Sequence, residues 1–162
     1  MLKEELKRIE YPFVFSYGNH ETNLELFKEI TNSDIGFMVL NFNEFKIISL
    51  DNSKKSITTN TLNNFKKELA DEKPIIVSMH VPISTSYNEE EMKKYDPYFV
   101  IYENNTDNIT KEFIDILVQN DNIKAILCGH THAHSETYFA KNKLQCCATS
   151  GLIGLVNKII IK

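Results

Sequence analysis

The chain of 162 residues is 42% hydrophobic, which is enough for one domain, residues 1–162, with a sizeable core. Its 18 basic and 22 acidic residues give a net charge of −4, and no basic cluster has the density of a nucleic-acid-binding surface. No apolar run is long enough to cross a membrane and the charged N-terminus has no signal-peptide core, so we expect a cytoplasmic protein.

Hydrophobic periodicity predicts an alternation of helices and strands. Leu2, Leu6 and Ile9 recur at helical spacing, and the apolar residues 13–17 are then typical of a strand. Further helices are predicted at residues 24–30, 58–70 and 106–120, and further strands at residues 35–40, 45–50, 75–79, 124–128, 136–140, 144–149 and 156–161. Helices that directly follow strands indicate the α/β class.

Residues 83–105 show little periodicity and include the acidic run Glu89-Glu90-Glu91. They predict a long loop. Long loops in small domains are often lids over a site, but a solvated surface excursion explains the same composition. Both interpretations stay open at this point.

The cysteines are Cys128, Cys146 and Cys147. Neither their number nor their spacing makes a disulfide framework, and they contain no C-x-x-C pair. We therefore expect three reduced strand residues rather than metal ligands.

Polar residues with ligand chemistry follow three of the predicted strands. Gly18-Asn19-His20-Glu21 follows residues 13–17, His80 follows residues 75–79, and Gly129-His130-Thr131-His132 follows residues 124–128. In open α/β sheets ligands bind outside the carboxyl ends of the strands, so these side chains are expected to meet there. Imidazole and amide ligands together suit Mn, Fe, Zn or Ni.

Each cluster taken alone has a simpler explanation. Taken alone, His80 is better explained as an ordinary core or surface histidine than as a ligand, and Asn19-His20 is explained by a turn. The repeated placement at strand ends makes a metal site the favoured interpretation over incidental histidines.

These blocks, in this order, resemble the last three sequence blocks of the calcineurin-like metallophosphoesterase family. The resemblance implies a mixed-sheet α/β sandwich of the metallophosphoesterase type, with two mixed sheets flanked by helices. It also implies two divalent metal ions and the hydrolysis of phosphate monoesters or diesters by a metal-bound hydroxide.

The resemblance assigns metal ligands residue by residue. Asn19, His80 and His130 match the family's ligands for the second metal, and His132 matches a ligand of the first. These assignments follow from motif position.

The resemblance also assigns the substrate contacts. His20 matches the histidine that contacts the substrate phosphate and protonates the leaving group, next to Asn19 in the same substrate-binding block, and Glu21 takes the supporting acidic position. His134 belongs to no block and is expected at the surface.

The family's first two blocks, Asp-x-His and Gly-Asp-x-x-Asp, do not occur before Gly18. The sequence therefore predicts a partial domain, incomplete at its N-terminus, without the carboxylates that offset the charge of two ions. We expect at most one well-held ion and weak or no turnover.

Three functions are weighed on these grounds. The first is a metal-dependent phosphoesterase, and the alternative is a catalytically inactive metal-binding or interaction module that retains the fold. The third, a structural domain with incidental histidines, is disfavoured by the repeated placement at strand ends. Strands missing from the sheet leave an unpaired edge, so we also expect association into homo-oligomers through that edge.

Overall fold

The computed structural model describes residues 4, 8–21, 23–31, 36–151 and 155–160. Its helices are α2 (Leu24–Thr31), α3 (Thr59–Glu68), α4 (Glu89–Met92), the 3-10 helix η1 (Pro97–Phe99) and α5 (Asn108–Gln119). Its strands are β1 (Phe37–Asn41), β2 (Lys46–Leu50), β3 (Ile75–Ser78), β4 (Ile83–Ser84), β5 (Ile101–Tyr102), β6 (Ile123–Cys128), β7 (Ser135–Ala140) and β8 (Lys143–Cys147). The predicted helix around Leu2 and Leu6 lies outside the described residues.

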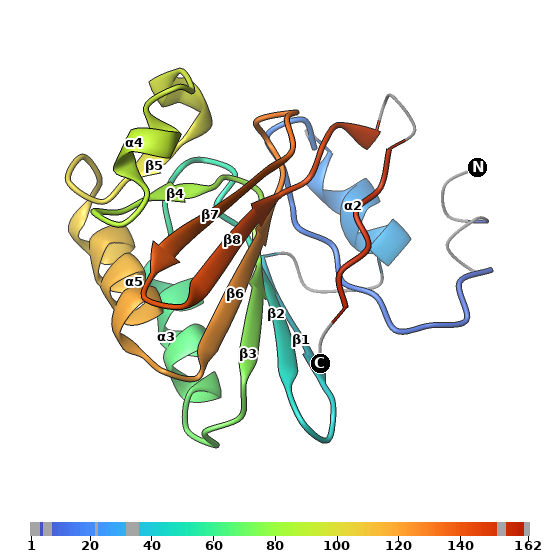
Figure 1. The fold of residues 1–162 in the computed structure, drawn as a ribbon. Helices are drawn as coiled ribbons and strands as arrows, with labels where there is room; N and C mark the ends of the chain where they lie inside the picture. Colours follow the sequence, from blue (N-terminus) through green and yellow to red (C-terminus); the bar gives the residue numbers. More distant parts are fainter. Residues whose placement is uncertain (1–3, 5–7, 22, 32–35, 152–154, 161–162) are drawn as a thin grey trace.

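One mixed sheet organises the chain (Figure 1). Its six strands have the order β1-β2-β3-β6-β8-β7, and β4 and β5 form a separate parallel pair. Strands β2, β3, β6 and β8 run parallel, while β1 and β7 pair antiparallel at the two edges. The carboxyl ends of β2, β3 and β6 therefore lie side by side. We call the side of the sheet where these strands end its carboxyl edge, as distinct from the outer strands β1 and β7.

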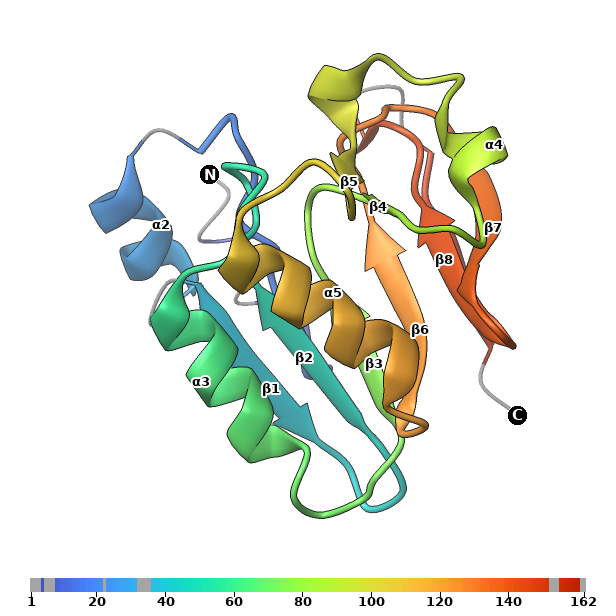
Figure 2. The same cartoon turned by 90° about the vertical axis from the view of Figure 1, so that its left-hand side faces the viewer.

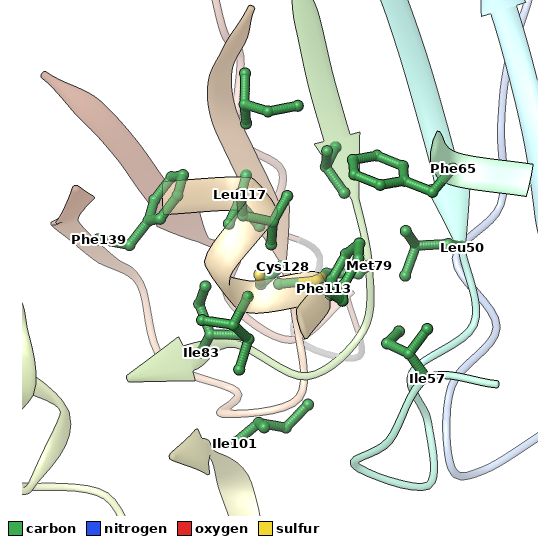
Figure 3. Close-up of a cluster of buried hydrophobic side chains, with 14 of the residues drawn as sticks. Leu50, Ile57, Phe65, Met79, Ile83, Ile101, Phe113, Leu117, Cys128 and Phe139 are labelled. Atoms are coloured by element: carbon green, nitrogen blue, oxygen red, sulfur yellow. The ribbon is translucent and has the colours of Figure 1, made fainter. Parts of the chain in front are cut away.

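Helices α3 and α5 cover the same face of this sheet (Figure 2). Thr58 caps α3 and Asp107 caps α5 through side-chain oxygens that accept backbone N–H groups. The rings of Phe65 on α3 and Phe113 on α5 meet edge to face with centroids 5.1 Å apart. Figure 3 shows these rings within the hydrophobic core, which also contains Leu50.

The mixed α/β class is confirmed. The strands predicted at residues 35–40 and 45–50 are confirmed where they are described, and they pair antiparallel as β1 and β2. The helices predicted at residues 58–70 and 106–120 correspond to α3 and α5. The loop predicted at residues 83–105 is corrected in part, because it contains α4, η1 and the β4–β5 pair.

The strand predicted at residues 13–17 is wrong. The segment joins no strand pairing, because β2 already has β1 and β3 as neighbours and β3 has β2 and β6. It crosses the face opposite α3 and α5 instead, where Ser49 Oγ donates to Phe15 O at 2.5 Å. Ser16 Oγ lies 2.7 Å from Ser78 Oγ, which anchors the segment on β3.

The strand predicted at residues 156–161 is also wrong as far as it is described. Residues 155–160 pair with no strand, and Val156 is 91% exposed. An apolar run predicts a strand by composition, but a strand also needs a free edge, and both sides of β8 are taken by β6 and β7.

In the part of the chain that the structure describes, no helix is long and apolar enough to cross a membrane.

Candidate metal centre

The loops that follow β3 and β6 are tied together by backbone hydrogen bonds. Met79 N–H donates to Leu127 O at 2.9 Å, and Gly129 N–H donates to His80 O at 3.0 Å. The strand pairing therefore continues beyond the ends of β3 and β6. It brings the rings of His80 and His130 to a centroid distance of 4.7 Å.

Asn19 completes this pair from a third segment. Its Oδ1 atom lies 2.8 Å from His80 Nε2. The preceding Gly18 makes the approach possible, because a Cβ atom there would lie 2.9 Å from His80 Cε1 and 2.7 Å from Glu21 Oε2. Glu21 supports the turn, since its Oε2 atom accepts the Gly18 N–H at 2.6 Å.

His20 and His132 lie at the border of this cluster. Both are exposed, and both are close enough for their charges to lower the pKa values of His80 and His130. His132 adopts a left-handed backbone, with φ of 55°, as does His130, with φ of 62°. Such conformations are uncommon for residues other than glycine and occur often at functional sites.

His134 lies outside the cluster, and its side chain is 51% exposed. Its Nδ1 atom is 3.2 Å from Asn157 Nδ2, and its Nε2 atom is 3.6 Å from Glu136 Oε1.

Burial keeps the two inner imidazoles neutral. His130 is only 6% exposed, and desolvation is the main reason that its pKa is lowered. Desolvation, followed by the neighbouring histidines, lowers the pKa of His80 to about 4, although the charge of Asp51 opposes this shift. A neutral imidazole has a free lone pair, which a metal ligand requires.

The donor chemistry of the cluster suits a divalent transition metal ion. Asn19 offers an amide oxygen beside His80, and His80 and His130 offer two neutral imidazoles beside each other. Among the described residues, no group of three or more His, Cys, Asp or Glu side chains is arranged to hold a metal. A site here therefore depends on the Asn19 amide as well as on imidazoles.

Asn52 supports the cluster and was missed by the sequence reasoning. Its buried Oδ1 atom accepts the N–H groups of both His80 and Val81 at 2.9 Å, and its Nδ2 donates to Val81 O at 2.7 Å. Asn52 thus determines the backbone course at His80. A polar residue directly after the strand at 45–50 was the available signal, because that strand ends at the same edge.

The second missed group belongs to residues 83–105. Tyr98 and Phe99 of η1 lie against His130, with ring centroids 5.4 and 5.2 Å from it, and Tyr98 OH accepts from Asn19 Nδ2 at 3.3 Å. The segment is interpreted from the sequence either as a lid over a site or as a surface loop. The structure places η1, one part of the segment, beside the site. Its aromatic residues have no periodicity that would have indicated this position.

Comparison with known proteins gives one finding. The family model described as calcineurin-like phosphoesterase matches residues 1–134, a range that contains Asn19, Asn52, His80, Tyr98 and His130. No curated protein matches the chain.

Asn52→Ala is expected to destabilise the fold by about 2–4 kcal/mol, because it leaves buried backbone groups of His80 and Val81 without partners. Urea denaturation measures this change. Asn63→Ala, at an exposed position of α3, is the control and should change stability by less than about 0.5 kcal/mol. Equal stability of the two variants would contradict the role given to Asn52.

The metal-free protein is expected to lose stability as the pH falls from about 6.5 towards 4. The folded pKa of His80 is about 4 and its ordinary value is 6.5, so in this window protons bind preferentially to the unfolded chain. After allowance for solvent screening at a half-buried site, the loss attributable to His80 is roughly 1–2 kcal/mol.

Thermal unfolding with a chelator present, at several pH values, tests this dependence. His80→Gln should flatten the dependence, whereas His134→Gln, at an exposed position, should leave it unchanged. A slope that is the same in all three proteins would refute the assignment to His80.

Proposed function

Because the chain belongs to the calcineurin-like phosphoesterase family, we propose that it hydrolyses phosphate monoesters or diesters with a divalent transition metal ion. The observation that carries this proposal is the contact of Asn19 with His80 and of His80 with His130 at the carboxyl edge of the sheet. The family match covers all three residues.

Asn19, His80 and His130 would hold the ion, and Mn, Fe, Zn or Ni suits this donor set. A divalent ion bound there would supply Lewis acidity towards phosphate oxygens and would lower the pKa of a bound water. The burial that keeps His80 and His130 neutral also keeps them available as ligands near pH 7. His132 borders the same space and is the candidate ligand for a second, weaker ion.

His20 is the candidate general acid. It is exposed, so substrate can reach it, and it directly follows Asn19. As an imidazolium it would contact a phosphate oxygen and donate a proton to the departing alkoxide, which typically contributes about 10²–10⁴-fold to the rate. Glu21 acts indirectly, since its carboxylate holds the backbone of Gly18.

A catalytically inactive metal-binding or interaction module that retains the fold is the second candidate. It is favoured by the lack, within the described ranges, of any metal-holding group of three His, Cys, Asp or Glu side chains. Three neutral donors leave the charge of a divalent ion uncompensated, which weakens both binding and catalysis. For the same reason we propose that at most one ion is held well.

Hydrolysis of p-nitrophenyl phosphate and bis-p-nitrophenyl phosphate in the presence of Mn²⁺ separates the two candidates. His20→Ala should reduce kcat by about 100-fold or more while metal binding is retained, because a general acid is lost. His130→Ala should abolish both hydrolysis and metal binding, and His134→Ala should change neither hydrolysis nor metal binding. Metal binding by the unaltered chain without turnover would favour the inactive module.

The metal content is expected to be at most one tightly bound ion per chain. Elemental analysis after equilibration with Mn²⁺ or Zn²⁺ and gel filtration measures this ratio. Two ions retained per chain would show that further ligands compensate the charge and would contradict the one-ion expectation.

A further inference from the structure

Tyr98 places a large aromatic ring at the border of the candidate metal centre. Its ring centroid lies 5.4 Å from that of His130, and its hydroxyl accepts from Asn19 Nδ2 at 3.3 Å. It therefore touches two of the three candidate ligands. Even so, 55% of Tyr98 is exposed to solvent.

The ring is held in place by the elements around it. Phe99 packs edge to face against it with centroids 5.1 Å apart, and the Tyr98 carbonyl oxygen lies 3.4 Å from His130 Nε2. Lys55 Nζ donates to Pro97 O at 2.5 Å and so ties the start of η1 to the loop after β2. Because these contacts already fix the ring, a partner can stack on it at little entropic cost.

The electrostatics beside the ring favour an anion. Lys55, whose Nζ donates to Pro97 O, and His20 both lie close enough to His130 for their charges to contribute to its lowered pKa. A phosphate held among Asn19, His130 and the bound ion would thus lie next to an exposed aromatic surface. The two features together describe a ligand with a phosphate and an aromatic ring separated by a short link.

We propose that Tyr98 forms the subsite for the organic part of the substrate, and that the substrate is an aryl ester of phosphate. The inference rests on the proposed function, because the phosphate position is set by the metal centre. A ring bonded directly to the ester oxygen remains within reach of Tyr98, which itself contacts the ligands. In a nucleotide, by contrast, a sugar separates the base from the phosphate.

Calorimetric binding of phosphonates to the Mn²⁺-loaded full chain tests the proposal without turnover. Benzylphosphonate mimics an aryl phosphate, and cyclohexylmethylphosphonate matches it in size without an aromatic ring. We expect benzylphosphonate to bind about three- to tenfold more tightly, as typical of an aromatic pair. Tyr98→Ala should bring the ratio of the two affinities close to one.

Two variants separate stacking from other effects. Tyr98→Phe keeps the ring and loses the bond to Asn19, so the ratio should persist. Tyr138→Ala, which removes a ring of similar exposure on β7, should leave the ratio unchanged. Loss of the ratio in Tyr98→Phe would show that the hydroxyl is responsible and would overturn the stacking subsite.

The remaining outcomes separate the Tyr98 subsite from the phosphoesterase function on which it rests. Equal affinity of both phosphonates for the unaltered chain would overturn the subsite and leave the phosphoesterase proposal standing. Failure of the metal-loaded chain to bind either phosphonate or inorganic phosphate would overturn both. If only the phosphonate analogue of adenosine 5′-monophosphate loses affinity in Tyr98→Ala, the aryl assignment is wrong and the subsite takes nucleotides.

Discussion

The parallel alignment of β2, β3 and β6 is the constraint on which the candidate site depends. Because the three strands end at one edge, Asn52, His80 and His130 leave the sheet side by side. Backbone pairing beyond β3 and β6 then sets the distance between the two histidines, and the Asn52 amide fixes the turn at His80. The strands thus position the candidate ligands His80 and His130, while Asn19 reaches them from a segment outside the sheet.

Burial has two consequences at this edge. Burial lowers the pKa values of His80 and His130 in the folded protein, so at acidic pH the unfolded chain binds more protons and the folded state loses stability. It also keeps both imidazoles in the form that binds metal. The exposed His20 and His132 lie close enough to this neutral pair to lower its pKa values, and the exposed Tyr98 contacts His130.

The sequence indicated the α/β class and the helices α3 and α5, because each depends on local periodicity and on helix caps such as Asp107. It placed His80 and His130 at the ends of neighbouring strands, because both follow short apolar runs. It failed at residues 13–17 and at the described residues 156–160, whose apolar composition is typical of a strand but which pair with no strand. It missed Asn52 and Tyr98, because their roles depend on contacts with residues far away in the sequence. Local hydrophobic periodicity carries no information about such contacts.

Anomalous diffraction from a crystal soaked in Mn²⁺ or Zn²⁺ tests whether Asn19, His80 and His130 hold one divalent ion. We expect a strong anomalous peak at about 2.0–2.2 Å from Asn19 Oδ1 and from a ring nitrogen of each histidine. A peak bound by other residues, or no peak at this edge of the sheet with the metal in excess, would contradict it.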